Sequence, residues 1–251
     1  ADALSERVPY TLCDWDAEAG TITFVVLEKG QSSRKLCLME PGECLAHVTG
    51  PLGIPLDIRH YGTVVLLGGC YGIGAMYPAA RAFREAGNRV ISVAEARSWY
   101  LEYHRDKLER VSDEFIQSTM DGSNGVKGHA ADVLKDRLAA GEKVDLVVAV
   151  GCPFMMMITA KETAPYGIPT LASLNPIMVD GTGMCGACRI TVGDQIKFAC
   201  VDGPFFDAHQ IDWDEVKDRR SAYSAAEIQS VGRTASVGAH HHHPGGCGCH
   251  A

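Results

Sequence analysis

The sequence predicts an α/β fold with an antiparallel β-barrel part, a doubly wound parallel sheet and a small cysteine-rich C-terminal loop domain. Three observations lead to this prediction. The first 50 residues alternate short apolar runs with turn residues. Residues 63–173 alternate continuous apolar runs with helical periodicity. Residues 179–200 concentrate glycine and cysteine.

The composition describes an ordinary globular chain and excludes some functions. Of the 251 residues, 46% are hydrophobic and 22% are charged, with a net charge of -8. Nucleic acid is therefore not an expected partner. No charged-then-apolar leader opens the sequence, and the longest apolar run, residues 146–160, is too short and too broken to span a bilayer. We expect a cytoplasmic protein without a membrane span.

The N-terminal part shows the spacing of a small antiparallel barrel. Short apolar runs are separated by the turn segments EAG, KGQSS and EPGE. The expected strands are Pro9 to Asp14, Thr21 to Glu28, Lys35 to Met39 and Glu43 to Thr49.

The central part predicts strands that are buried on both faces, as in a parallel sheet. Its expected strands are Thr63 to Leu67, Arg89 to Ala94, Val144 to Val150 and Pro169 to Ser173. Helical periodicity covers Gly74 to Gly87 and Ala130 to Ala140. The last part contains a hairpin of Arg189 to Val192 and Gln195 to Ala199, then a polar helical stretch after Asp214 and a loose tail from Val231. The predicted divisions are residues 1–58, 59–174, 175–218 and 219–251.

The strongest chemical signal is the segment VDGTGMCGACRITVGDQIKFAC, residues 179–200. Cys185 and Cys188 form a Cys-x-x-Cys pair, and Cys200 follows across the hairpin. Thiolates hold iron, and a glycine-rich loop lets one short segment direct several sulfurs at one [2Fe-2S] cluster. Four residues separate Asp180 from Cys185, so Asp180 stands where a plant-type Cys-x4-Cys-x2-Cys series has its first cysteine, and a carboxylate is a reasonable fourth ligand.

Other interpretations of this segment remain open. A zinc site could use the same residues, and it would give a colourless protein where a [2Fe-2S] centre gives a brown one. Reduced structural cysteines fit less well, because the loop is too glycine-rich to be core. A thioredoxin-like redox pair does not fit, since this pair opens a hairpin.

A second signal is the glycine-rich turn LLGGCYGIGAMYP, residues 66–78, which follows a buried strand and opens a helix. Such a turn allows backbone to approach a pyrophosphate, although it could also be a tight structural turn. The residues expected at the phosphates are Gly69, Gly72, Ile73 and Gly74.

Acidic Glu95 ends the next strand, where a carboxylate would accept the ribose hydroxyls of NAD(H). Arg97 and Ser98 instead favour NADP(H), because they could hold its 2′-phosphate. Cys152 ends another strand at the ligand-binding edge of the sheet. It could face the nicotinamide as a catalytic residue, or it could be a small buried hydrophobe.

Taken together, the three parts resemble the ferredoxin-NADP reductase superfamily. Within it, the chain is similar to the electron-transfer subunits of dihydroorotate dehydrogenase. It is still more similar to the small (alpha) subunits of NADH-dependent reduced ferredoxin:NADP oxidoreductase, also known as sulfide dehydrogenase. The resemblance covers roughly residues 5–218, and the segments SLNPIMVDGTGMCGACRITVGDQIKFACVDGPFFDAH, PYGIPTLASLNP and DGSNGVKGHAADVLK carry it.

The resemblance implies cofactor contacts. The cluster would be held by Asp180, Cys185, Cys188 and Cys200. The barrel would bind FAD through RVPYT, with Arg7 at the phosphate, Thr11 at the reactive isoalloxazine N5, and Pro9 and Tyr10 beside the ring. The FAD pyrophosphate would lie at Gly30, Ser32 and Ser33 in KGQSS.

Three departures from the family pattern bear on these expectations. The chain is expected to begin inside the flavin barrel, so that the barrel is truncated, completed by a partner or impaired in FAD binding. The usual GGGxGIAPxxP turn reads GGCYGIGAMYP, with Cys70 in place of a glycine. The tail with His240 to His243, Cys247, Cys249 and His250 lies outside the family pattern and suggests either a metal-binding tail or disorder.

The resemblance implies an NAD(P)H-linked oxidoreductase subunit that moves electrons between NAD(H), FAD and a [2Fe-2S] cluster. Its partner would be a larger subunit with a second flavin and [4Fe-4S] clusters, which reaches ferredoxin and in which electrons would be bifurcated. One alternative is a non-catalytic relay or docking subunit that keeps only the cluster. Another is a reductase module of a hydrogenase or a sulfide-oxidising complex.

Overall fold

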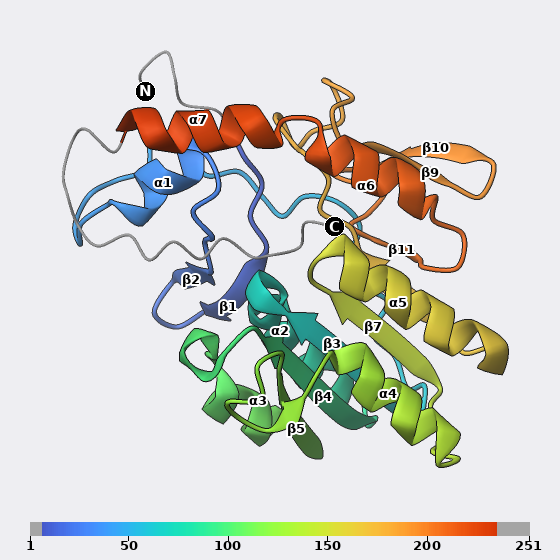
Figure 1. The fold of residues 1–251 in the computed structure, drawn as a ribbon. Coiled ribbons are helices and arrows are strands. Elements are labelled where there is room, and N and C mark those ends of the chain that lie inside the picture. Colours follow the sequence, from blue (N-terminus) through green and yellow to red (C-terminus); the bar gives the residue numbers. More distant parts are fainter. Residues whose placement is uncertain (1–6, 235–251) are drawn as a thin grey trace.

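A computed structural model describes residues 7–234 of the chain. Figure 1 shows a central sheet with helices on both faces and two smaller hairpins beside it. The strands are β1 (Leu12–Asp16), β2 (Thr21–Phe24), β3 (Thr63–Gly69), β4 (Arg89–Ala96), β5 (Glu114–Thr119), β6 (Val126–Lys127), β7 (Leu146–Val150), β8 (Thr170–Ser173), β9 (Arg189–Val192), β10 (Gln195–Phe198) and β11 (Phe205–Asp207). The α-helices are α1 (Gln31–Cys37), α2 (Ile73–Glu85), α3 (Arg105–Val111), α4 (Ala130–Ala139), α5 (Pro153–Thr163), α6 (Trp213–Ser221) and α7 (Ser224–Thr234). The 3-10 turns are η1 (Cys70–Gly72), η2 (Trp99–Leu101) and η3 (Ala164–Tyr166).

The central sheet has the strand order β11-β8-β7-β3-β4-β5-β6. All neighbours are parallel except β11, which pairs antiparallel with β8. Strand β3 lies between β4 and β7, so the chain reverses its direction of winding there. The predicted mixed α/β fold with a doubly wound parallel sheet is confirmed. Ligands of such sheets bind where the strand order reverses, at the carboxyl ends of the strands.

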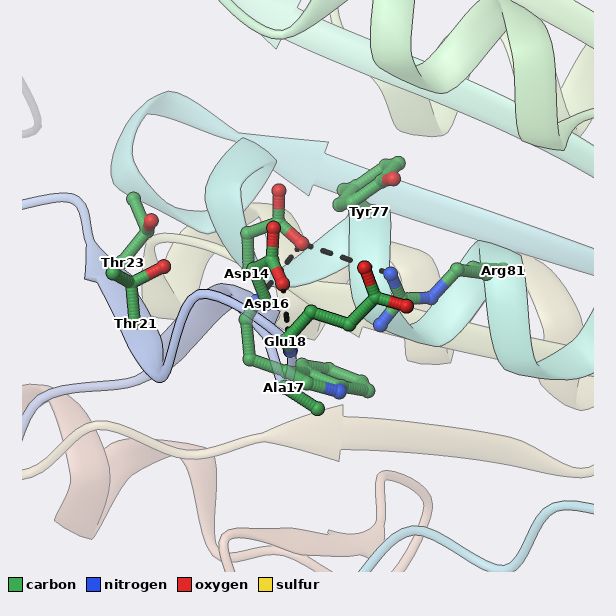
Figure 2. Close-up of a pocket in the computed structure, with 9 residues that line it drawn as sticks. Asp14, Asp16, Ala17, Glu18, Thr21, Thr23, Tyr77 and Arg81 are labelled. Atoms are coloured by element: carbon green, nitrogen blue, oxygen red, sulfur yellow. Dashed lines mark hydrogen bonds and ion pairs between the residues drawn. The ribbon is translucent and has the colours of Figure 1, made fainter.

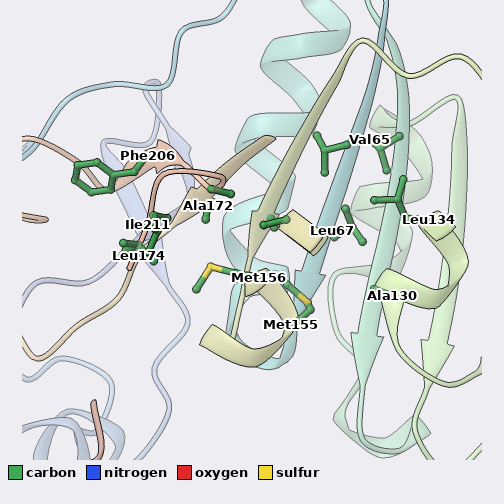
Figure 3. Packing of buried hydrophobic residues seen from close by; sticks show 14 of the residues in the cluster. Val65, Leu67, Ala130, Leu134, Met155, Met156, Ala172, Leu174, Phe206 and Ile211 are labelled. Carbon is green, nitrogen blue, oxygen red and sulfur yellow. The ribbon is translucent and has the colours of Figure 1, made fainter. Parts of the chain in front are cut away.

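Two apolar cores cover the two faces of this sheet. One contains Val65 and Leu67 of β3 together with Leu134 of α4 and Met155 of α5 (Figure 3). The other packs side chains of α2 and α3 against the opposite face. Successive residues of a strand point to opposite faces, so a strand covered on both sides must be continuously apolar. This explains why β3 and β7 were predictable from their unbroken apolar runs.

The N-terminal part forms fewer strands than the sequence predicts. Strands β1 and β2 pair antiparallel, which confirms the first two predicted strands, although β1 starts and ends later than predicted and β2 is shorter. The predicted strand Lys35 to Met39 is wrong, because α1 covers most of it, and the predicted strand Glu43 to Thr49 is irregular chain. Ser33 explains the helix: its hydroxyl accepts hydrogen bonds from the backbone N–H groups of Lys29 and Gly30, at 2.9 and 3.0 Å, and thereby caps the first turn.

The C-terminal part contains the predicted hairpin, as β9 and β10. It also contributes β11 to the central sheet, a pairing that the sequence did not predict. Helices α6 and α7 follow in the stretch predicted to be helical, but α7 continues to Thr234, past the predicted start of the loose tail at Val231. The histidine- and cysteine-rich end of the tail lies outside the described residues. Within residues 7–234, no helix combines the length and the apolarity needed to cross a bilayer.

Candidate functional site

The glycine-rich turn lies at the carboxyl end of β3, where the strand order reverses. Strand β3 ends at Gly69, η1 forms the turn, and α2 begins at Ile73. A Cβ on Gly72 would lie 2.1 Å from the carbonyl oxygen of Val150, so only glycine fits against β7. The sequence placed this turn correctly, because a glycine-rich segment between a buried strand and a helix is typical of a phosphate-binding turn.

A tyrosine that sequence reasoning missed braces this turn. The Tyr103 hydroxyl accepts a hydrogen bond from the backbone N–H of Gly74 at 3.0 Å and donates to the carbonyl oxygen of Cys70 at 2.9 Å. Burial raises the pKa of Tyr103, so the hydroxyl keeps its proton at neutral pH. No local pattern marks Tyr103, because only the fold brings it next to a turn about thirty residues earlier.

Glu95 lies at the end of β4, opposite Gly69 in the strand register, as expected for a ribose-binding carboxylate. It is buried, and its two oxygens face the start of α4. One oxygen accepts the backbone N–H of Ala130 at 2.8 Å, and the other lies 3.4 Å from Nδ1 of His129. The carboxylate therefore also caps a helix. Arg97, two residues further on, is exposed to solvent.

Cys152 occupies the same edge of the sheet and begins a helix that the sequence did not predict. It is the N-cap of α5, and its sulfur accepts a long hydrogen bond of 3.4 Å from the backbone N–H of Met155. A Cβ on Gly151 would lie 3.1 Å from the backbone of Gly69. The residue before Cys152 therefore packs against the end of β3, where the glycine turn begins. The structure thus brings the turn, Glu95 and Cys152 to one sheet edge.

The predicted cluster loop contains a close pair of thiols. The sulfur atoms of Cys188 and Cys200 are 3.3 Å apart, and both side chains are buried. Burial and the neighbouring Cys188 raise the pKa of Cys200 to about 11. Backbone N–H groups, first that of Ala187, lower the pKa of the exposed Cys185. A site that combines buried thiols with backbone donors at a sulfur suits a bound metal cluster, whose binding releases the thiol protons.

Asp180 lies in the same loop and faces Thr182. Its Oδ2 accepts hydrogen bonds from the hydroxyl and from the backbone N–H of Thr182, which lower the pKa of the carboxyl group. Throughout residues 7–234, no three His, Cys, Asp or Glu side chains converge closely enough to hold a metal ion. The structure therefore joins two of the four predicted ligands and places Asp180 and Cys185 in the same glycine-rich segment.

The predicted flavin segment lies against this loop. A Cβ on Gly181 would be 3.9 Å from Cβ of Pro9, and the positive charge of Arg7 acts on Asp180 to lower its pKa. Tyr10 packs near Phe24 of β2, with 6.3 Å between the ring centroids, while Thr11 is exposed. The other predicted flavin residues, Gly30, Ser32 and Ser33, lie at the start of α1.

A pocket of 530 Å³ lies between the β1–β2 hairpin and α2 (Figure 2). Its lining includes the carboxylates of Asp14, Asp16 and Glu18, which would repel the phosphates of a nucleotide. Arg81 of α2 lies 3.7 Å from Asp14 and stacks 4.0 Å above the ring of Trp15. These contacts attach the β1–β2 hairpin to α2.

Comparisons with known proteins agree with this arrangement. Residues 175–212 match the family described as the iron-sulfur cluster binding domain of dihydroorotate dehydrogenase B. A homologue of the dihydroorotate dehydrogenase B (NAD(+)) electron transfer subunit from Thermotoga maritima is 44% identical over 228 residues, which are 91% of this chain and 80% of the relative. A protein from Clostridium beijerinckii that is named only for the adh 3′ region is 38% identical over 99% of this chain and 86% of its own length. A solved structure of NADH-dependent reduced ferredoxin-NADP oxidoreductase, described for flavin-based electron bifurcation, is 43% identical and superimposes with a TM-score of 0.84 over 91% of this chain and 82% of that one.

Proposed function

Because the chain belongs to the family of dihydroorotate dehydrogenase B electron transfer subunits and their homologues, we propose that it moves electrons between NAD(H), FAD and a [2Fe-2S] cluster. The expected family resemblance is thereby confirmed. The larger partner that we propose is a flavin and [4Fe-4S] subunit, through which electrons would reach ferredoxin. FAD supplies hydride exchange with NAD(H) and single-electron transfer to the cluster.

The observation that carries this proposal is the proximity of the flavin segment to the cluster loop. A Cβ built on Gly181 would lie 3.9 Å from Cβ of Pro9, and the charge of Arg7 adds to the effect of Thr182 in lowering the pKa of Asp180. A flavin held by Arg7, Pro9, Tyr10, Thr11, Gly30, Ser32 and Ser33 would therefore lie next to a cluster held by Asp180, Cys185, Cys188 and Cys200. Short separation between the two groups is what a subunit that passes single electrons requires.

The chain's own residues would position the nucleotide. Gly69, Gly72, Ile73 and Gly74 would hold its pyrophosphate at the start of α2, with Glu95 at the ribose and Arg97 nearby. The acidic Glu95 favours NAD(H) over NADP(H). Cys152 follows the same sheet edge and would face the nicotinamide, while Thr11 would face the flavin.

The chemistry of the proposed cluster supports a cytoplasmic location. Iron is held by cysteine thiolates, and a reducing compartment keeps cysteines available as such ligands. We therefore place the protein in the cytoplasm, as the electron-transfer part of a heteromeric complex.

Replacement of a ligand tests the cluster assignment. In Cys188→Ser, we expect the iron content and the EPR signal of the reduced two-iron centre to be lost while the far-UV circular dichroism is kept. Cys44→Ser is the matched control, because Cys44 is exposed and lies outside the cluster loop. Unchanged iron in Cys188→Ser, or zinc in the wild-type protein, would refute the assignment. Asp180→Cys should keep a cluster with a shifted potential, and an unshifted potential would exclude Asp180 as a ligand.

A second function is favoured by one observation at the glycine turn. The N–H of Gly74 already donates to Tyr103, and Glu95 already caps α4, so groups expected to meet a nucleotide have partners within the chain. A relay or docking subunit that keeps only the cluster would show this pattern. Bound FAD near one per chain, reduced by NADH, supports the enzyme, whereas a cluster without FAD supports the relay. A reductase module of a hydrogenase or sulfide-oxidising complex would contain the same cofactors and differ in its co-purifying partner.

A further inference from the structure

Helix α6 ends with two adjacent arginines that reach two different sites. Neighbouring residues of a helix point about 100° apart, since one turn takes about 3.6 residues. Arg219 and Arg220 therefore contact different parts of the molecule from one rigid element. Figure 1 shows α6 beside the β9–β10 hairpin and above α5.

Arg219 holds the cluster loop. Its Nη2 donates a hydrogen bond of 2.8 Å to the carbonyl oxygen of Ala187, which lies between the proposed ligands Cys185 and Cys188. Its Nε is buried and has no hydrogen-bond partner among the described residues. A positive charge fixed this close to the loop, and partly removed from water, favours the more negative, reduced state of a cluster there.

Arg220 holds the glycine turn. Its Nη1 donates to Oδ1 of Asn175 at 2.7 Å and to the hydroxyl of Tyr71 at 3.1 Å. Tyr71 belongs to the turn itself, and its hydroxyl donates to the carbonyl oxygen of Gly151 at 3.1 Å. The amide of Asn175 donates to the same carbonyl and to the Tyr71 hydroxyl, at 2.9 and 2.8 Å. The hydrogen bonds of this cluster thus connect the turn to Arg220, so a shift of Tyr71 would disturb the contacts of Arg220.

Helix α6, which carries both arginines in its last turn, is firmly attached to the cluster domain. Asp212 caps its first turn by accepting the N–H groups of Asp214 and Glu215, at 3.1 and 2.9 Å. The Glu215 carboxylate accepts the backbone N–H of Thr191 in β9 at 2.7 Å, and Val216 is buried. A helix anchored in this way moves as a unit, which makes it a suitable connection between two sites.

We propose that Arg219 and Arg220 are positioning residues that couple nucleotide occupancy of the glycine turn to the reduction potential of the [2Fe-2S] cluster. This inference rests on the proposed function. A nucleotide pyrophosphate at the turn would reposition Tyr71, and Arg220 and α6 would carry that change to the Arg219–Ala187 contact. Coupling between two sites is reciprocal, so reduction of the cluster would change the affinity for nucleotide by the same factor.

The test measures this factor with ADP-ribose, which has the adenosine and pyrophosphate of NAD but no nicotinamide to be reduced. Its affinity for the FAD- and cluster-loaded protein is measured with the cluster oxidised and reduced, and the cluster potential is titrated by EPR with and without it. We expect the two affinities to differ by about fivefold, near the lower end of typical coupling. For one electron this corresponds to a shift of about 40 mV.

Three variants locate the coupling. In Arg220→Met, the factor should fall below about twofold, while cluster content is kept. Lys217→Met is the matched control, because it removes the same charge from the same helix and Lys217 pairs with exposed Asp214 of that helix. Its factor should stay near the wild-type value. Tyr71→Phe keeps the ring and removes the hydroxyl, so it should also uncouple the sites even where Arg220→Met fails to fold.

The outcomes separate this inference from the proposed function. Equal affinities in the two redox states of a wild-type protein that binds both cluster and ADP-ribose would overturn the coupling alone. Full coupling in Arg220→Met or Tyr71→Phe, or its loss in Lys217→Met, would overturn the role of the two arginines. A wild-type protein that lacks the cluster or fails to bind ADP-ribose would overturn the proposed function and the inference together.

Discussion

Gly72→Ala tests whether the glycine turn is built by close backbone packing. Gly72 has φ -67° and ψ -20°, which alanine adopts freely, and alanine favours a helical backbone by about 1 kcal/mol over glycine. With open space around it, the substitution would therefore stabilise the protein. The structure predicts the opposite sign, because the new Cβ would lie 2.1 Å from the oxygen and 2.5 Å from the carbon of the Val150 carbonyl.

The opposing atoms belong to the backbone of β7, which is paired with β3 and β8 and cannot move aside as a flexible side chain would. We expect a loss of about 3 kcal/mol, the upper end of the usual range for overpacking. For a chain of this size, that lowers the melting temperature by about 6–12 °C. Affinity for NADH should fall as well, since the displaced carbonyl precedes Gly151 and Cys152.

Differential scanning calorimetry of the as-isolated protein measures this change. Gly50→Ala is the matched control, because a Cβ on Gly50 meets nothing within 4 Å. It should change the free energy of unfolding by no more than about 0.5 kcal/mol. A Gly72→Ala protein that melts at or above the wild-type temperature would refute the close packing of the turn against β7.

Three further substitutions test the surroundings of the turn. Tyr103→Phe leaves the N–H of Gly74 without its acceptor and should cost about 1–3 kcal/mol in urea unfolding; an unchanged urea midpoint would show that this hydroxyl does not brace the turn. Asp14→Asn removes the ion pair with Lys107 and should cost up to about 1 kcal/mol at pH 7. The Lys107 hydrogen bond lowers the pKa of Asp14 below 3.8, so the wild-type advantage is complete above that value and disappears as the pH falls through the folded-state pKa; a difference that persists at lower pH would contradict this account. Glu95→Ala should cost about 1–2 kcal/mol because the N–H of Ala130 at the start of α4 loses its acceptor, whereas Glu95→Gln keeps an acceptor and should lose less; equal thermal shifts in the two variants would argue against this hydrogen bond.

The sheet was largely predictable because its strands are apolar on both faces. The apolar runs at β3 and β7 need no tertiary information, since any other placement would expose them. Strand β5 was missed because its sequence, EFIQST, is largely polar. Its side chains are satisfied only within the fold: Gln117 donates to the carbonyl of Ala94, and Ser118 donates to that of Gly128.

The error at residues 35–39 has a local cause. Lysine, leucine and cysteine in short alternation fit a half-buried strand as well as one side of a helix. The helix is favoured by two residues at its start. Gly30 is the N-cap with an extended backbone, and its N–H donates to the hydroxyl of Ser33 in the first turn of α1. A serine three residues after a glycine is too common to predict this outcome.

The site was predictable where chemistry follows sequence spacing. A cluster site is predictable from three cysteines and an aspartate in one glycine-rich loop. A phosphate-binding turn is predictable from glycines between a strand and a helix. Tyr71, Tyr103, Asn175 and Arg220 do not, because each acts on a segment distant in the sequence. Their roles come from the order of strands in the sheet, which brings the ends of β3 and β7 together with the entry to the cluster loop.

The antiparallel strand β11 has a consequence for how this protein can be divided. It lies beyond the cluster loop in the sequence, yet it completes the edge of the sheet by pairing Phe205, Phe206 and Asp207 with β8. A gene fusion or truncation made at residue 175 would therefore cut through a continuous sheet and strip its border strand. An exchange of the redox module should therefore keep β8, β11 and α6 together with the cluster loop, because the two modules share one sheet and α6 holds the loop.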